Sequence, residues 1–341
     1  MNRDRFHVLT SRYASLRIGI IGDFCLDRYF EIDPARQEIS IETGLPVHNI
    51  VNVRCQPGAA GTILNNLVSL GVRDIYAVGF CGEDGEGYEL RRSLASRRGV
   101  RLDHFISTAQ RKTFTYTKPL VLEPGKPPVE LNRLDIKNWS ATPEPVVASL
   151  AAAVRELATR VDALILMDQV DLAETGVVTQ ALLHVIAEVA AGRQNLLVLA
   201  DSRRGLQGFP KVTFKMNGVE LARITSGSTG GSIVQIRKQA ETLAARQGKA
   251  VFVTLADQGI VGATPDGRSH HSPSLPLRGE IDIVGAGDSV TANLTAALAA
   301  GATVPEALEL AMSAASIVIH QLGTTGTASV EQLSKLVQLC A

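Results

Sequence analysis

The chain has 341 residues, of which 45% are hydrophobic, 20% charged and only 4% aromatic. This composition is typical of a folded globular protein and excludes a disordered chain. Lysine plus arginine and aspartate plus glutamate each number 34, so no net charge draws the protein to nucleic acid or to an anionic membrane, and neither is expected as a partner.

The N-terminal residues 1–7 are polar, lack the apolar core of a secretion signal, and are expected to lead directly into the first strand. No apolar run approaches the roughly 20 residues that span a bilayer. The four cysteines lie far apart without C-x-x-C spacing, which favours a reduced, cytoplasmic protein over a zinc protein. No repeat or linker marks a boundary, so we expect one domain over residues 1–341.

Short apolar runs alternate with helical patterns along most of the chain. Strands are expected at 16–22, 74–80, 162–168, 195–201, 212–216 and 250–255. Helices are expected at 58–70, 145–158, 174–191, 231–247, 288–300 and 305–320. This alternation predicts an α/β fold with a doubly wound, mainly parallel sheet and helices on both of its faces.

Two segments interrupt the alternation. Residues 29–56 and 111–135 contain β-type runs rich in Thr and Val, with Pro and Gly but without helical periodicity. We expect them to pair into a small sheet that covers the cleft of the main domain as a lid. Lids of this kind can also pair between subunits, so a homodimer through the lid is a further expectation.

The segment DIVGAGD, residues 282–288, is the most informative in the chain. Gly285, Ala286 and Gly287 precede an Ala-rich helix, where unpaired backbone N–H groups can bind an anion. Asp288 beside them could act as a general base toward a hydroxyl. The alternative is that Asp288 only caps the helix and the glycines make a tight turn.

This segment resembles the C-terminal signature D-x-x-G-A-G-D of PfkB-type sugar kinases, which have the ribokinase-like fold. The resemblance implies an ATP- and Mg²⁺-dependent carbohydrate kinase in which Asp288 is the catalytic base and Gly285 to Gly287 form the anion hole. It covers roughly residues 16–335. Ile283 and Asn293 depart from the usual pattern, at positions that do not touch the reacting groups.

Two later segments match ATP-binding landmarks of that family. Asn217 and Glu220 resemble its N-x-x-E, which implies that Glu220 helps position Mg²⁺, through water; the alternative is a capping box at a helix N-terminus. Thr254 and Gly259 resemble the T-x-x-x-x-G segment along the ATP phosphates, and the alternative is a hairpin turn.

The opening G-D-x-x-L-D-R-Y, residues 22–29, resembles the heptose-7-phosphate kinase branch of the family. Asp23 follows the first strand, where ligands bind in open α/β sheets, and it could accept hydrogen bonds from sugar hydroxyls. Asp27 is a second candidate sugar ligand, with a local ion pair to Arg28 as its alternative. The segment L-N-R-L-D around Arg133 extends the resemblance, and Arg133 is available for a substrate phosphate.

The substrate segment departs from this branch, which has G-G-x-x-N. Here Gly58 is followed by Ala59, which adds a methyl group, and Thr62 replaces the amide with a shorter hydroxyl. Asp201-Ser202-Arg203 likewise stands where D-P-K is usual. The resemblance therefore leaves the identity of the sugar open.

The resemblance also implies a K⁺ site beside the anion hole, formed by Asp282, Val284 and a C-terminal loop that contains Gly323 and Ser329. Two other functions were weighed. A nicotinamide dehydrogenase would need G-x-G-x-x-G after the first strand, which is absent. A non-catalytic sugar-phosphate or nucleotide binder is compatible with the altered substrate segment, but it would have no need of a base at position 288.

Overall fold

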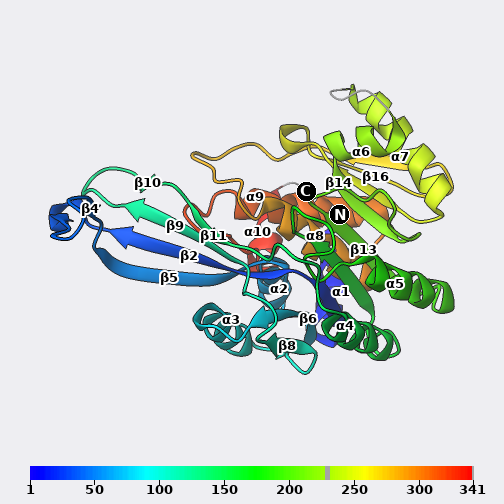
Figure 1. The fold of residues 1–341 in the computed structure, drawn as a ribbon. Coiled ribbons are helices and arrows are strands. Elements are labelled where there is room, and N and C mark those ends of the chain that lie inside the picture. The colour runs from blue at the N-terminus through cyan, green and yellow to red at the C-terminus, as the bar shows by residue number, and fades with distance from the viewer. Residues whose placement is uncertain (227–230, 340–341) are drawn as a thin grey trace.

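The computed structural model describes residues 1–226 and 231–339, which form two main sheets and their covering helices (Figure 1). The larger sheet has ten strands, in the order β17-β16-β15-β14-β13-β12-β1-β6-β7, with β8 paired to β6. Its strands are β1 (Arg17–Gly22), β6 (Asp74–Gly82), β7 (Val100–Arg101), β8 (Phe105–Thr108), β12 (Ala163–Asp168), β13 (Leu197–Ser202), β14 (Thr213–Asn217), β15 (Val251–Thr254), β16 (Ile260–Ala263) and β17 (Ser269–Ser272).

Pairing in this sheet is parallel except for β16 and β17, which form an antiparallel edge. The central strands are buried on both faces, as their continuous apolar sequences require. One core lies under α1 (Arg3–Ser11), α2 (Ala60–Ser69), α3 (Gly85–Ala95), α8 (Ala286–Ala299), α9 (Val304–Val318) and α10 (Val330–Leu339). The other lies under α4 (Glu144–Leu157), α5 (Gln180–Gly192), α6 (Gly218–Thr225) and α7 (Ile233–Gln247). The doubly wound prediction is confirmed.

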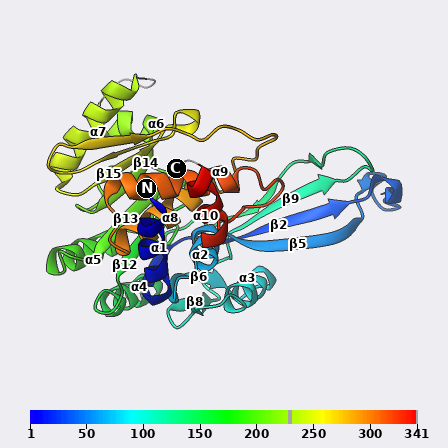
Figure 2. The same cartoon turned by 180° about the vertical axis from the view of Figure 1, so that it is seen from behind.

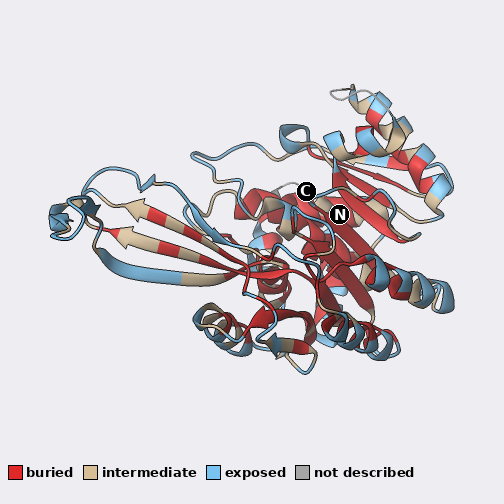
Figure 3. Cartoon of the chain, viewed as in Figure 1, coloured by how far each residue is buried: buried red, intermediate tan, exposed pale blue. Residues whose placement is uncertain are grey.

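The second sheet projects away from the main body, as Figures 1 and 2 show from opposite sides. It contains β2 (Phe24–Ile32), β5 (Ile50–Ala59), β9 (Thr115–Val121), β10 (Val129–Glu130) and β11 (Leu134–Ile136). A hairpin of β3 (Glu38–Ile39) and β4 (Pro46–Val47) lies at its tip. The outer half of β5 is exposed (Figure 3). The predicted small lid sheet is confirmed, although it begins earlier, at Phe24, and its first half extends to Ala59.

Three expectations about local structure were wrong. The N-terminus does not lead directly into a strand: α1 precedes β1, capped by the Asn2 side chain, and it is polar on most of its surface. The helix expected from residue 174 begins only at Gln180, where Thr179 provides the cap. The helix expected from residue 58 begins at Ala60, because the two preceding residues still pair with β2. Within the described ranges, no helix is both long and apolar enough to cross a membrane.

Candidate active site

The site lies where the chain order of the main sheet reverses. β1 pairs with β6 on one side and with β12 on the other, so the loops that follow these strands leave in opposite directions and open a crevice. Polar residues gather at the carboxyl ends of the parallel strands along this edge: Asp23, Asp168, Asp201, Asn217 and Thr254. α8 and the lid sheet adjoin the same edge (Figure 1).

The N-terminus of α8 forms the predicted anion hole. Gly285 is its N-cap, in the left-handed conformation with φ of 83°, which a residue with a side chain adopts at a cost. The Asp282 carboxylate accepts a hydrogen bond from Val284 N at 3.0 Å and holds the turn. Among the described residues, the N–H groups of Gly287 and Asp288 have no acceptor. They are therefore free to bind an anion.

Asp288 is half-buried in the first turn of α8. Burial, the largest cause, and the neighbouring carboxylates of Asp201 and Asp27 together raise the pKa of its carboxyl group to about 7, against the opposing effect of Lys215. A pKa near the ambient pH suits a general base, because the group is ionised often enough to act and basic enough to take a proton.

A buried ion pair lies on the face of the sheet that α8 covers. The ammonium group of Lys215, from β14, donates to Oδ2 of Asp201, from β13, at 2.8 Å. The Thr291 hydroxyl, one turn into α8, donates to the same oxygen at 2.9 Å. A methyl group at Gly287 would lie 3.3 Å from Nζ of Lys215, so this ammonium is immediately adjacent to the anion hole.

The two aspartates after β1 have different surroundings. Asp23 is buried, and its two carboxylate oxygens accept hydrogen bonds from Val177 N at 2.7 Å and Gln169 N at 2.8 Å. Burial and the nearby Asp168 raise its pKa to about 6. The carboxylate of Asp27 accepts no hydrogen bond within residues 1–226 or 231–339, although its backbone is part of the lid sheet. Asp23 therefore orders the loop after β12, but each of its oxygens can accept a second hydrogen bond, so both aspartates remain candidate sugar ligands.

The altered substrate segment, residues 58–62, lies against Asp27 and the start of α8. A methyl group at Gly58 would lie 2.5 Å from Oδ2 of Asp27, so only glycine fits beside that carboxylate. Ala59 has φ of 52° and ψ of −116°, a conformation that strains any residue with a Cβ. Thr62 is buried and its hydroxyl has no partner in the described structure, while its methyl group faces Gly285.

The inner face of the lid carries several polar side chains in register. Asp27 pairs with Gln56 on β5 and with Tyr116 on β9, so their side chains share one face of the sheet. Lys118, the next residue of β9 on that face, lies over the Tyr29 ring at 5.1 Å and makes no ion pair in the described chain.

Arg133, in contrast, is already paired. Its guanidinium group donates to both oxygens of Asp135, at 2.9 Å for the shorter contact to Oδ2, and lies over the Tyr116 ring. Lys118 was not identified from the sequence.

The expected ATP-binding residues lie together on two neighbouring strands. Asn217 and Thr254 are directly opposite in the parallel pair β14–β15. Asn217 and Glu220 form a complete capping box at the start of α6, in which Oε2 of Glu220 accepts from Asn217 N at 2.7 Å. The other carboxylate oxygen of Glu220 makes no hydrogen bond within the described part of the chain. Gly259 closes the β15–β16 hairpin with φ of 91°.

The expected K⁺ ligands are only partly brought together. Asp282 and Val284 lie in the turn before α8. The C-terminal loop reaches this turn through Thr325, which contacts Gly285, and a link from Gln56 to Thr325 at 2.9 Å ties the lid to it. Gly323 is in the left-handed conformation, and Ser329 is engaged in hydrogen bonds with Gln332 at the start of α10.

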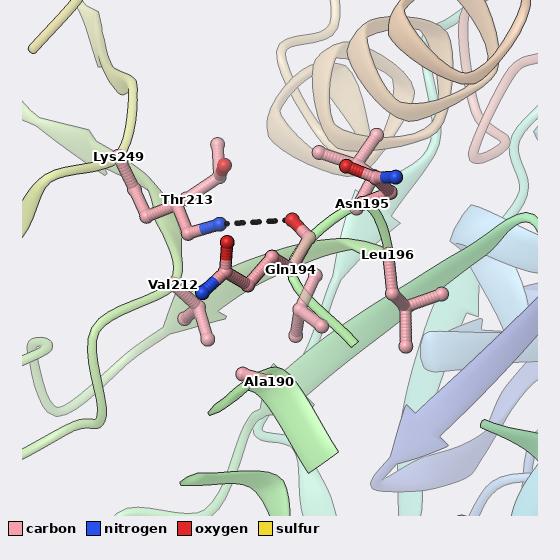
Figure 4. A pocket seen from close by; sticks show the side chains of 9 residues that line it. Ala190, Gln194, Asn195, Leu196, Val212, Thr213 and Lys249 are labelled. Atoms are coloured by element: carbon pink, nitrogen blue, oxygen red, sulfur yellow. Dashed lines mark hydrogen bonds between the residues drawn. The ribbon is translucent and has the colours of Figure 1, made fainter. Parts of the chain in front are cut away.

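A pocket of about 200 Å³ lies away from this site, at the opposite ends of β13 and β14. Gln194, Leu196 and Thr213 line it, and Lys249 donates to the Gln194 carbonyl across it at 3.4 Å (Figure 4). In the described ranges, no group of three or more His, Cys, Asp or Glu side chains could hold a metal ion alone.

Comparison with known proteins agrees with this arrangement. The chain matches the family described as pfkB family carbohydrate kinase over residues 30–331. It is 32% identical over 331 residues to the bifunctional protein HldE of Azotobacter vinelandii, and 30% over 323 residues to that of Gluconobacter oxydans. These alignments cover 96% and 94% of this chain but only 65% and 64% of the relatives, so the chain spans just under two thirds of their length.

Solved structures show the same fold. The phosphofructokinase-2 of Escherichia coli superimposes with a TM-score of 0.72 at 19% identity, and the ribokinase of Arabidopsis thaliana with 0.70 at 18%. Each comparison covers 95% of this chain and 99% of the other. The predicted ribokinase-like architecture is confirmed.

Proposed function

Because this chain belongs to the pfkB family of carbohydrate kinases, we propose that it transfers the γ-phosphoryl group of ATP to a hydroxyl of a sugar phosphate, with Asp288 as the general base. The juxtaposition of a carboxylate of raised pKa and free N–H groups at the start of α8 supports the proposal most directly. Family membership also decides against a nicotinamide dehydrogenase, and the presence of a base argues against a pure binder.

In the proposed reaction the sugar hydroxyl lies between Asp27 and Asp288. A new bond forms between the hydroxyl oxygen and the γ-phosphorus, and the bond from that phosphorus to the β–γ bridging oxygen breaks. Asp288 takes the hydroxyl proton and ADP leaves with the bridging oxygen. The N–H groups of Gly287 and Asp288 stabilise the negative charge on the transferring group, which is the main contribution a protein makes to phosphoryl transfer.

ATP is proposed to lie along Asn217, Thr254 and Gly259, at the end of the strand β14 that carries Lys215. One carboxylate oxygen of Glu220 has no partner among the described residues and could bind a water of Mg²⁺, and bound Mg²⁺ would neutralise phosphate charge. Its role is therefore compatible with the capping box, since the box uses only the other oxygen. Residues 1–341 are proposed to act as one kinase unit in the cytoplasm, where ATP is available and free thiols such as Cys25 stay reduced.

Heptose 7-phosphate is the substrate that we propose to test first. The resemblance of the front motif to the heptose-7-phosphate kinase branch favours it. Lys118 is opposite Tyr29 on the neighbouring strand, and Arg133 lies over the ring of Tyr116, which pairs with Asp27. Both positive charges lower the pKa of Asp27, against the larger effect of burial. A free ammonium and an aspartate side by side would suit a phosphate next to sugar hydroxyls.

The test is an ADP-release screen over matched free and phosphorylated sugars, including heptose 7-phosphate. We expect turnover with the phosphorylated sugar, and Lys118→Met should raise its KM roughly tenfold or more because a charged hydrogen bond is lost. The matched control Lys126→Met, an exposed lysine paired with Glu123, should not change KM. Turnover of free sugars alone, or an unchanged KM in Lys118→Met, would contradict the proposed substrate.

A K⁺ site at Asp282, Val284 and the loop from Gly323 to Ser329 is proposed by analogy with the family. A structure of the E. coli phosphofructokinase-2 is described as a complex with potassium. If the site exists, the rate should rise when K⁺ replaces a large organic cation. An equal rate of ADP release with K⁺ and with the organic cation would exclude the K⁺ site.

We also propose a homodimer through the lid. β5 is the edge strand of the lid sheet, and within the described structure it pairs only with β2. It exposes Ile50, Val51 and Val53, while Ile41 is fully exposed at the tip. Such an edge readily pairs with a second strand. Sedimentation should find a dimer that Val51→Asp dissociates, and a monomeric wild type would exclude it.

A further inference from the structure

The buried ion pair beside the anion hole is not explained by the fold alone. Lys215 alternates with apolar neighbours in β14, and its side chain is 10% exposed. Removing a lysine and an aspartate from water costs several kcal/mol per ion, which a pair in the interior often fails to recover. An apolar pair of similar volume would hold β13 and β14 together equally well.

The position of Lys215 is also unfavourable for the helix above it. Gly287 is in the first turn of α8, where the helix dipole is positive and anions, not cations, are stabilised. An ammonium group 3.3 Å from a methyl position on that turn adds a second positive element to the first. The carboxylates of Asp201 and Asp288 lie near this ammonium group, and an anion bound at the helix N-terminus would be attracted by both positive elements.

The hydrogen bonds of Lys215 leave capacity for such an anion. An ammonium group has three N–H donors, and in the described structure Asp201 accepts only one of them. Thr291 donates to the same Asp201 oxygen, so the carboxylate is held from two sides and fixes the direction of the lysine. Burial lowers the pKa of Lys215, but the surrounding carboxylates of Asp201, Asp288 and Glu220 outweigh burial and raise it, so the ammonium stays charged.

We propose that Lys215 donates a hydrogen bond to the γ-phosphoryl group of ATP at the anion hole, and that Asp201 is a positioning residue that orients Lys215. This inference rests on the proposed function. It gives the site a third donor, a full positive charge, beside the N–H groups of Gly287 and Asp288. The positive charge of Lys215 thus acts on the γ-phosphoryl group that is transferred, and not on the part of the nucleotide that becomes ADP.

The first test compares nucleotides and needs no sugar. Binding of Mg²⁺-ADP and of the non-hydrolysable Mg²⁺-β,γ-imido-ATP is measured by calorimetry for wild type and Lys215→Met. We expect the variant to lose at least about tenfold in affinity for the imido analogue, as for one charged hydrogen bond, with ADP affinity within about twofold. Equal changes for both nucleotides, or no change, would overturn the contact. Nucleotide binding is measured without sugar. The test of Lys215 is therefore valid even if no sugar substrate is found.

The second test measures turnover and controls for folding. Lys215→Met should lower kcat by about 10² or more, the scale for one lost donor to a developing charge, with little change in the KM of the sugar. Lys215→Met combined with Asp201→Asn removes the uncompensated carboxylate and restores charge balance. If the loss came from a disrupted fold, this double variant would regain activity, which would overturn the proposal. Lys249→Met, at the far end of the same strands, is the matched control and should leave kcat and both affinities unchanged (Figure 4).

Discussion

Replacing Asp288 with asparagine removes the proposed base while preserving size and most of the local packing. General-base assistance contributes typically about 10² to 10⁴ in rate, so kcat should fall by at least about 10²-fold. Wild-type kcat/KM should rise with pH through the pKa of about 7 and be roughly tenfold below its plateau at pH 6, because only the ionised carboxylate accepts the proton. The variant should lose this pH dependence.

The same substitution should stabilise the protein. The pKa of Asp288 is raised in the folded state, from 3.8 to about 7, so the unfolded chain binds fewer protons and folding is penalised increasingly as pH rises from 4 to 7. A shift of this size corresponds to about 4 kcal/mol at pH 8, and the half-buried position of the side chain reduces it to an order of 1–2 kcal/mol. Asp288→Asn should therefore melt higher than wild type at pH 8 and less so at pH 5.

Steady-state ADP release and thermal melts at the two pH values measure both effects. Asp103→Asn, an exposed aspartate in the β7–β8 connection, is the matched control and should change neither. Near-normal turnover in Asp288→Asn, or loss of activity together with a lower melting temperature, would refute the general-base assignment.

Three further outcomes are expected. Ala59→Gly should raise the free energy of unfolding by about 1 kcal/mol in urea titration, because glycine removes the strain at φ of 52°; a lower value would contradict the strain. Asp23→Asn should lower the free energy of unfolding by about 2 kcal/mol, since its amide group would face a backbone N–H donor, and an unchanged value would mean that the loop is held otherwise. Sugar plus β,γ-imido-ATP should change the fluorescence of Trp139, the single tryptophan of the chain, and protect Lys112 from trypsin, whereas no change in either would count against lid closure.

The anion hole could be predicted from the sequence because its determinants are local. Gly285 supplies the left-handed cap, Gly287 leaves space, and Asp288 follows within the same turn. The alternation of strands and helices likewise predicted the sheet, since apolar runs such as residues 162–168 are too short for core helices and are buried on both faces. The polar α1 carries no comparable apolar stripe, which is why it was not expected.

The division of roles between Asp23 and Asp27 could not be read in the same way. The donors that engage Asp23, at Gln169 and Val177, are 146 and 154 residues away, so only the folded chain shows that this carboxylate also orders the loop after β12. Lys215 left a weaker signal, as a charged residue inside the apolar run of residues 212–216. Its partner Asp201 lies on the adjacent strand and becomes a neighbour only through parallel pairing.

The charges around Asp288 combine into one argument about the pH at which the site can work. A freely solvated aspartate has a pKa near 3.9 and is too weak a base to assist an alcohol well. Burial raises the pKa of Asp288, Asp201 and Asp27 raise it as well, and the positive charge of Lys215 acts in the opposite direction. Lys215 supplies the opposition, held by the same Asp201 that contributes to the rise. The ion pair therefore acts on both reactants of the proposed step: Asp201 makes the base stronger, while Lys215 keeps it ionised and offers a positive charge to the phosphoryl group that it helps to transfer.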